Sequence, residues 1–148
     1  MRLPHKDDNG LWPWQDTKSA DYRAKYKIYM VSPLWQFKKI LCRIESGRKC
    51  VACENKSRLT IHHINYSRMF HEEQDDLICL CWKHHKKVEN WSKTICPRPN
   101  RQEIFNFLNC KDETFPIGNR DFEILGGLLT EWEEAESNGY FHPYHTHF

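Results

Sequence analysis

The sequence predicts an α+β fold, in which a small ββα core surrounds a bound metal ion and helices flank that core on its N-terminal and C-terminal sides. A Cys-x2-Cys pair at positions 50 and 53 is followed by a Cys-x2-His pair at positions 81 and 84, a spacing typical of closed zinc sites. Two β-type segments, residues 59–64 and 77–81, come before a helical segment that begins at Trp82. A chain of 148 residues forms only a modest hydrophobic core, and a bound metal ion adds to the stability of such a core.

The N-terminal third of the chain is expected to form an irregular arm over residues 1–25, then a helix. Residues 20–30 fit either a helix or an extended segment. A clear helix begins at Ser32-Pro33, because Ser32 can cap free N–H groups and Pro33 suits the first helical position; Gly47 is expected to end it. The helix has an apolar stripe, with three basic residues lying away from it. The stripe is Leu34, Phe37, Leu41 and Ile44, and the basic residues are Lys38, Lys39 and Arg43.

Two more helices are expected beyond the ββα core, over residues 101–108 and 121–138. The second of these has an apolar face made of Phe122, Leu125, Leu129 and Trp132. We therefore expect residues 26–95 to form the metal-centred domain and residues 96–148 an acidic helical extension. Three histidines near the end are expected to belong to a tail rather than a site: His142, His145 and His147.

Positive charge is concentrated in the middle of the chain. Residues 18–101 carry 18 Lys and Arg against 8 Asp and Glu, whereas residues 102–148 carry 2 against 9. Lys and Arg release the counterions that condense on nucleic acid, so this distribution favours a polyanionic partner, DNA, over a merely solvated surface. The acidic segment raises a further hypothesis, in which it restrains DNA access, docks a protein partner or mediates self-association.

No secretory signal pattern and no long apolar run occur in the sequence. We therefore expect a cytoplasmic protein that is not secreted and has no membrane partner. In a reducing compartment its cysteines serve as metal ligands or buried thiols rather than disulfides. Cys42, Cys96 and Cys110 are expected to be small buried side chains.

The metal ligands expected from spacing are Cys50, Cys53, Cys81 and His84, which bind structural Zn²⁺. Cys79 competes with Cys81, because residues two apart in a strand share a face. Cys81 is favoured, because only it has a ligand three residues later. His62, His63 and His85 remain without a structural role. Adjacent residues on a helix point about 100° apart, so His85 is free to serve a second, open metal site while His84 faces the zinc.

These motifs together resemble the HNH endonuclease family, in the zinc-stapled ββα-metal form found in phage and bacterial proteins. The resemblance covers about residues 26–91 and depends on several short stretches. They are Ser32-Pro33-Leu34-Trp35, Cys50-x2-Cys53, His62-His63-Ile64-Asn65-Tyr66, Glu72, Asp76-Leu77 and Cys81-x2-His84-His85. His84 stands where the family usually has a fourth cysteine, and imidazole is an ordinary zinc ligand.

The resemblance implies a metal-dependent DNA endonuclease that leaves 5′-phosphate ends in a bacterial or phage-infected cell. His63 matches the general base, and His62 and His85 match the ligands of one catalytic divalent ion, Mg²⁺ or Mn²⁺, with Ni²⁺ also acceptable. Asp76 takes the place of the asparagine that ties the loop holding the base, with Asn65 as a substitute.

Contacts to nucleic acid are expected from a set of basic residues: Arg48, Lys49, Arg58, Arg68, Lys83, Lys86 and Lys87. Two other functions stay open at this point. One is a non-catalytic zinc module that binds nucleic acid or protein, and the other is a nuclease subunit active only within a larger phage packaging or defence complex.

Overall fold

The computed structural model describes residues 20–64 and 68–137, which divide between two compact units. One unit comprises residues 1–37 and 126–148, and the other comprises residues 38–125. Every expected metal ligand and site histidine belongs to the second unit. The expected histidine tail, most of the N-terminal arm and Asn65 lie outside the described residues.

Helix α1 (Ala20–Met30) settles the choice between helix and extended segment, and it places residues 20–25 in a helix rather than in the expected irregular arm. Helix α2 (Pro33–Glu45) begins as expected at Ser32. The Ser32 hydroxyl accepts the Trp35 backbone N–H at 3.2 Å and donates to the Tyr29 carbonyl at 2.7 Å, so one side chain ends α1 and caps α2.

The end of α2 confirms the role expected for Gly47. The Gly47 N–H bonds the Ile44 carbonyl at 2.9 Å, and the Arg48 N–H bonds the Arg43 carbonyl at 2.7 Å. Gly47 has a φ of 80°, a left-handed conformation that favours glycine. A Cβ at this position would also lie 3.1 Å from the Phe115 ring, so both backbone conformation and space require glycine.

The buried face of α2 differs from the expected apolar stripe. Lys38 and Cys42 are buried, whereas Leu34, Phe37 and Leu41 are only half-buried. The expectation that Lys38 lies away from the buried face is therefore wrong. The physical reason is a carboxylate, Glu72, which receives the Lys38 ammonium inside the protein. Apolar periodicity cannot reveal a lysine that is buried because of a partner far along the chain.

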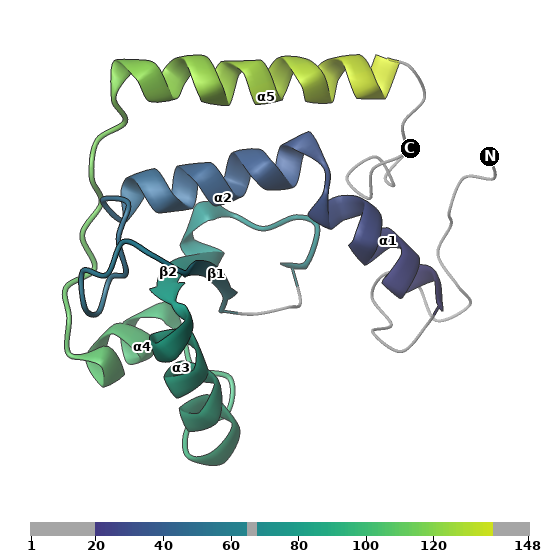
Figure 1. Ribbon diagram of the computed structural model, residues 1–148. Helices are drawn as coiled ribbons and strands as arrows, with labels where there is room; N and C mark the ends of the chain where they lie inside the picture. Colours follow the sequence, from purple (N-terminus) through teal and green to yellow (C-terminus); the bar gives the residue numbers. More distant parts are fainter. Residues whose placement is uncertain (1–19, 65–67, 138–148) are drawn as a thin grey trace. The chain divides into compact units, whose positions relative to one another are not determined.

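Strands β1 (Leu59–His63) and β2 (Leu77–Cys81) form a two-stranded antiparallel sheet (Figure 1). In its register His62 lies opposite Ile78 and His63 opposite Leu77. All five residues of β2 are buried, which explains why this strand appears as a continuous apolar run rather than an alternating one. Helix α3 (Trp82–Thr94) follows β2 directly, so the expected order of strand, strand and helix is confirmed.

The connection between the strands ends in a short 3-10 helix, η3 (Gln74–Asp76). Glu73 and Asp76 form a reciprocal capping box around it. The Ile64 N–H bonds the Asp76 carbonyl at 2.8 Å and so closes the loop immediately after β1. This hydrogen bond therefore holds the two ends of the loop together beside the last residues of β1.

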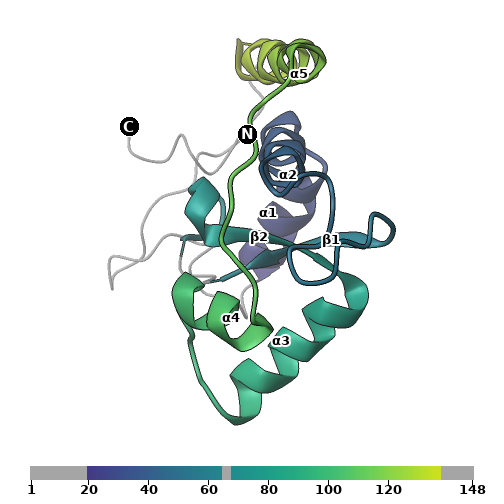
Figure 2. The same ribbon diagram turned by 90° about the vertical axis from the view of Figure 1, so that its left-hand side faces the viewer.

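Helix α4 (Arg101–Leu108) belongs to the same hydrophobic core as the sheet and α3 (Figure 2). Ile104 and Phe105 are buried together with Ile78, Leu80 and Val88. The Trp91 and Phe107 rings stack with their centroids 4.2 Å apart. A truncation after Arg101 would therefore remove part of this core.

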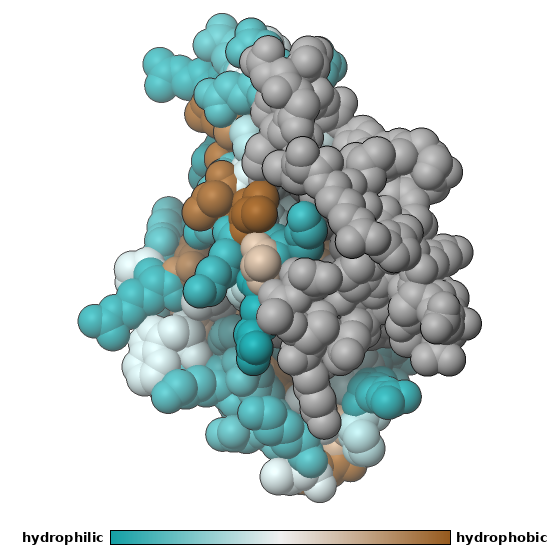
Figure 3. Space-filling view, turned by 90° about the vertical axis from the view of Figure 1, so that its right-hand side faces the viewer, coloured by the Kyte–Doolittle hydropathy of each residue, from teal (hydrophilic) through white to brown (hydrophobic). Residues whose placement is uncertain are grey.

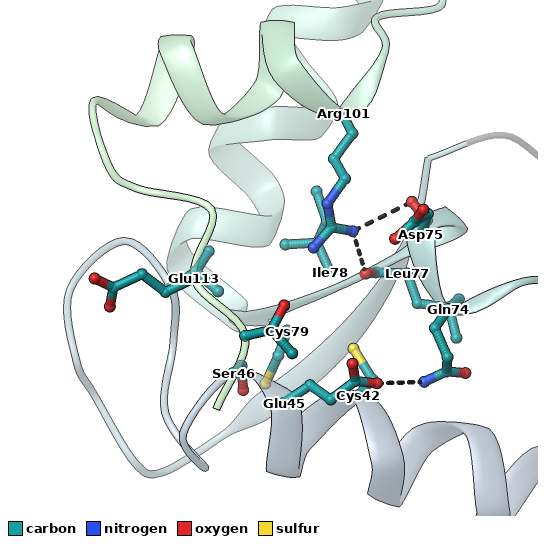
Figure 4. Close-up of a pocket in the computed structure, with 12 residues that line it drawn as sticks. Cys42, Glu45, Ser46, Gln74, Asp75, Leu77, Ile78, Cys79, Arg101 and Glu113 are labelled. Atoms are coloured by element: carbon teal, nitrogen blue, oxygen red, sulfur yellow. Dashed lines mark hydrogen bonds between the residues drawn. The ribbon is translucent and has the colours of Figure 1, made fainter. Parts of the chain in front are cut away.

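Arg101 fastens the start of α4 to the start of β2 (Figure 4). Its guanidinium donates to the carbonyls of Leu77 at 2.9 Å and Asp75 at 3.2 Å, and it pairs through two nitrogens with Asp112, at 2.7 Å and 3.0 Å. Such charge-assisted, bidentate contacts are among the stronger hydrogen bonds in proteins.

We expect Arg101→Met to lower the free energy of unfolding by about 2 kcal/mol, because the strand carbonyl and the Asp112 carboxylate lose a charged donor. Denaturant unfolding of the zinc-loaded protein measures this. Arg98→Met is the matched control, since Arg98 lies three residues earlier on an exposed turn. Equal midpoints for the two variants would contradict the role given to Arg101.

Helix α5 (Asn119–Ser137) begins at an ion pair between Asp121 and Arg48. Its expected apolar face is only partly buried. Leu125 and Trp132 are buried, but Phe122 is 60% exposed and Leu129 is 39% exposed. On the face drawn in Figure 3 most described side chains are hydrophilic, with small apolar patches among them. None of the described helices is long and apolar enough to cross a membrane.

Candidate metal centre and histidine site

The first two metal ligands lie in a tight knuckle between α2 and β1. The Cys50 carbonyl accepts the Glu54 N–H at 3.1 Å, and the Cys50 N–H bonds the Asn55 carbonyl at 2.8 Å. The Ala52 N–H points at the Cys50 sulfur at 3.4 Å. Backbone N–H groups directed at a sulfur stabilise its thiolate, which is the form that binds metal.

The second pair of ligands lies where β2 runs into α3. Cys81 is the last residue of β2 and the N-cap of α3, and His84 lies in the first turn of that helix. Burial raises the pKa of Cys81, but hydrogen bonds from the His84 backbone and ring, and from Cys53, outweigh burial and lower it to about 6. The Cys81 thiol is therefore suited to lose its proton at neutral pH when a metal ion binds.

The four expected ligands come together with the spacing that zinc requires. Their donor atoms all lie within 4.8 Å of one another, and no other group of three or more His, Cys, Asp or Glu residues in the described part of the chain is gathered in this way. The Cys53 and Cys81 sulfurs are 3.8 Å apart, and the His84 Nδ1 lies 3.3 Å from the Cys81 sulfur and 3.8 Å from that of Cys50. A tetrahedral zinc ion places its sulfur and nitrogen donors about 3.6–3.8 Å apart. The Cys3His group fits zinc.

The remaining cysteines are not part of this group. Cys79 is buried, burial raises the pKa of its thiol, and Cys81 rather than Cys79 belongs to the group that could hold a metal ion. Cys42 is buried as expected, and burial raises its pKa to about 12, which leaves it inert. Cys96 and Cys110 are only partly buried, contrary to expectation. The Cys96 thiol lies in the turn after α3 and contacts Glu103 at 3.3 Å.

His62 and His85 form a pair of imidazoles outside the Cys3His group. Their ring centroids are 5.1 Å apart in an edge-to-face arrangement, with His62 at the end of β1 and His85 in the first turn of α3. His84 and His85 thus have different neighbours: His84 lies beside the Cys81 sulfur and His85 beside the His62 ring. The His62 Nδ1 is buried without a hydrogen-bond partner within the part of the chain that the structure describes. A buried, unpaired nitrogen is costly unless a proton donor or a metal ion satisfies it.

Both rings are held in the neutral form that binds metals. Burial, with a smaller contribution from the neighbouring His85 and His63, lowers the pKa of His62 to about 4. Burial also lowers the pKa of His85, although Glu89 opposes that shift in part. Neutral imidazoles at pH 7 are ready to bind a divalent ion without releasing a proton.

Glu89 is a donor that our sequence analysis did not identify. Its carboxylate lies 3.1 Å from the His85 Nε2, one helical turn further along α3. The spacing of four residues between His85 and Glu89 is a signal that could have found it, because residues four apart lie on one face of a helix. The His62 and His85 nitrogens and this carboxylate oxygen are donor types that suit Mn²⁺ or Ni²⁺ and tolerate Mg²⁺, but the structure does not gather the three as closely as it gathers the Cys3His group.

His63 contacts a buried ion pair. Its Nε2 lies 2.7 Å from the Glu72 Oε2, and the Lys38 Nζ lies 3.1 Å from the Glu72 Oε1. Burial lowers the pKa of Lys38, and Glu72 raises it again in part. Glu72 is thus a contact residue of the expected base, and Lys38 is a site residue that the sequence analysis placed on an exposed face.

Asp76 fastens the loop beside these histidines. Its carboxylate accepts the Glu73 N–H at 2.9 Å and the Arg68 guanidinium at 2.7 Å, while its carbonyl accepts the Ile64 N–H. These contacts suit the loop-tying role that the HNH resemblance implies for this position.

The basic residues expected to contact nucleic acid have different surroundings. Arg48 pairs with Asp121, Lys49 with Glu54, and Arg68 with Asp76 and Glu73, so these three have acidic partners within the protein. Lys86 lies over the Trp82 ring and Lys87 over the Phe107 ring. Arg58 and Lys83 are exposed. The sequence analysis did not include two basic residues, Arg43 and Lys56, that line a concavity together with Arg48 and Leu59.

No family model, curated protein or solved structure matches this chain.

Proposed function

We propose that this chain is a metal-dependent DNA endonuclease of the HNH type, with His63 as general base. The observation that carries the proposal is the gathering of the three histidines that the Cys3His group does not use. His62 and His85 lie side by side, and His63 is close enough to both to affect their pKa values. A purely structural zinc module would not need three further histidines, two of them buried, next to its metal site.

Each residue has a defined part in the proposed reaction. His63 takes a proton from the attacking water, which is the role of a general base. His62 and His85, with Glu89 beside His85, would hold one divalent ion, and that ion would supply positive charge to offset the negative charge that develops on the phosphate and the departing 3′ oxygen. Cleavage on that side of the phosphorus leaves a 5′-phosphate. Asp76 keeps the loop that follows β1 closed, and the zinc ion would hold β2 and α3 in place under both histidine groups.

DNA is the proposed substrate because of the charge distribution. The middle of the chain is strongly basic, Arg58 and Lys83 are exposed, and Arg43 and Lys56 line a concavity together with Arg48. Basic side chains of this kind contact phosphates without reading the sequence. Raising the salt concentration should therefore weaken DNA binding more steeply than it lowers the stability of the folded protein.

The test is cleavage of supercoiled plasmid by the zinc-loaded protein, with and without Mg²⁺ or Mn²⁺. We expect nicked or linear product only when a divalent ion is added. The His85→Ala variant should lose at least tenfold in rate, because loss of one donor weakens ion binding. Thr94→Ala, on the exposed last turn of the same helix, should cleave like the wild type.

Absence of product from zinc-loaded wild type would contradict the proposal for the isolated chain. DNA binding without cleavage would then favour the non-catalytic zinc module. Cleavage that begins only when a partner protein is added would favour the subunit of a larger packaging or defence complex.

A further inference from the structure

A concavity at the start of β1 is lined by three basic side chains and one apolar side chain. The lining residues are Arg43 from α2, Arg48 and Lys56 from the loop between α2 and β1, and Leu59, the first residue of β1. All four belong to the unit formed by residues 38–125. Like charges that lie close together repel one another, so a concavity of this kind attracts an anion.

Arg43 is the most buried of the three cations. The residue is half-buried, and its Nε–H is buried with no hydrogen-bond partner within the part of the chain that the structure describes. Burial, with a smaller contribution from the positive charge of Arg43, lowers the pKa of Lys39 one turn earlier in α2. A guanidinium that merely solvated the surface would keep its N–H groups in water. The described residues therefore do not satisfy all the donors of Arg43.

The two other cations keep donors that can reach a ligand. Arg48 uses one guanidinium nitrogen, Nη2, to pair with Asp121, and a guanidinium has five N–H donors. Lys56 is exposed and lies near Glu54, but the Glu54 carboxylate pairs with Lys49 at 2.9 Å. Both cations can therefore present N–H groups to an anion in the concavity.

We propose that Arg43, Arg48 and Lys56 form a binding site for one phosphate group of the DNA backbone, separate from the histidines of the proposed cleavage site. A phosphate offers several acceptor oxygens and negative charge. The planar fork of an arginine matches two of those oxygens, and a lysine adds a compact point charge. That the phosphate belongs to DNA rests on the function proposed above, whereas recognition of a phosphate by these three side chains does not.

The position of the concavity suits a second contact with DNA that is held at the histidines. Leu59 is the first residue of β1, and His62 and His63 are its last two. At about 3.3 Å per residue, roughly 10 Å of strand separates the concavity from these histidines. One DNA strand advances about 3.4 Å per nucleotide along the helix axis, so about three nucleotides span that distance. A phosphate bound here holds the DNA in place without touching the scissile bond.

The first arm of the test measures DNA binding without added Mg²⁺ or Mn²⁺, so it needs no cleavage. Fluorescence anisotropy of a short labelled duplex gives the Kd of the zinc-loaded protein over a series of salt concentrations. Loss of one phosphate contact should lower the slope of log Kd against log salt concentration by about 0.9. We expect this for Lys56→Gln, an exposed position, together with a roughly three- to tenfold higher Kd at low salt.

Arg43→Gln is a second variant and should lower the slope in the same way. Its Tm and zinc content are measured alongside, because Arg43 is half-buried. Lys111→Gln is the matched control, since it removes one positive charge from an exposed residue that does not line the concavity. It should retain the wild-type slope. A slope for Lys56→Gln equal to that of Lys111→Gln would overturn the proposal.

The choice of duplex separates a phosphate contact from a base contact. Phosphates carry no sequence information, so the higher Kd of Lys56→Gln should be the same for two duplexes of unrelated sequence. A loss confined to one of the two sequences would indicate a contact with a base, and it would count against the phosphate site.

The second arm distinguishes a phosphate of DNA from free phosphate. Inorganic phosphate is added at constant ionic strength to the wild type and to Lys56→Gln, and the backbone amide of Leu59 is followed by ¹H–¹⁵N NMR. We expect a weak, saturable shift that is smaller in the variant. Such a shift with unchanged duplex slopes would identify free phosphate as the occupant and rule out DNA. Lower duplex slopes support the proposal with or without the shift, because DNA makes many contacts that a free ion lacks.

Failure of this site and failure of the nuclease function give different results. Wild type that binds DNA but cleaves none with a divalent ion would defeat the nuclease function, while the lower slopes of the two variants would still support the phosphate site. Wild type that cleaves DNA, with the same slope for Lys56→Gln and Arg43→Gln as for wild type, would retain the nuclease and overturn the phosphate site.

Discussion

Removal of zinc is expected to unfold the unit formed by residues 38–125. The four ligands connect the knuckle after α2 to the junction of β2 and α3, and the core around Ile78, Leu80 and Val88 surrounds that junction. Structural zinc contributes roughly 10–16 kcal/mol of apparent binding free energy in zinc-finger peptides, whereas a whole domain of this size is stable by about 5–15 kcal/mol. Without the ion, the gathered thiolates also repel one another.

The measurement is thermal unfolding and one-dimensional NMR of the protein before and after chelation, with zinc content determined in parallel. We expect loss of the cooperative transition on chelation and its return when zinc is restored. Cys50→Ser should behave like the chelated protein, because a serine hydroxyl does not replace a thiolate ligand. Cys96→Ser is the control, since Cys96 lies outside the ligand group and should still bind one zinc ion per chain. A metal-free protein with an unchanged Tm would contradict the structural role of the site.

His63→Ala is expected to lower the rate of DNA cleavage about 10²- to 10⁴-fold, the range typical for loss of a general base. His63 is not one of the four residues of the Cys3His group, so zinc content should not change. Nor is it among the basic residues available to phosphates, so the affinity for DNA should also be retained. The defect should therefore appear in the rate of the chemical step and not in binding.

Single-turnover cleavage of plasmid, with protein in excess over DNA, measures the chemical step. Because His63 is 7% exposed and contacts Glu72, the alanine variant also leaves a small gap beside a buried carboxylate. His63→Gln fills more of that space and provides a second variant with a smaller effect on stability. Cleavage by both variants at the wild-type rate would show that His63 is not the base.

Much of the secondary structure follows from local chemistry that the sequence displays. The start of α2 at Ser32, its end at Gly47, the bounds of β2 and those of α4 all lie where capping residues, glycine and apolar runs predict them. These signals are short-range, because a cap or a left-handed turn involves residues within four positions of one another. The candidate zinc ligands could also be predicted from the sequence. Each of the two pairs has a fixed local spacing, although the pairs are far apart along the chain.

Contacts between residues far apart in the sequence could not be predicted in the same way. Lys38 lies 34 residues from Glu72, and nothing in the pattern of α2 distinguishes it from Lys39. Arg101 was expected only as the first residue of a helix, yet it fastens β2 to α4. The expected phosphate contacts Arg48, Lys49 and Arg68 have acidic partners inside the protein, and composition alone cannot separate a paired basic residue from a free one.

The sequence by itself determined the order of the elements, the choice of zinc ligands and the set of histidines that remain for a second site, because each depends on spacing along the chain. Only the tertiary structure decided how those histidines are arranged. It placed His62 next to His85 and directed His63 toward a carboxylate on the loop between the strands. The orientation of an imidazole depends on which partners reach its two nitrogens, and those partners come from segments that meet only when the chain folds.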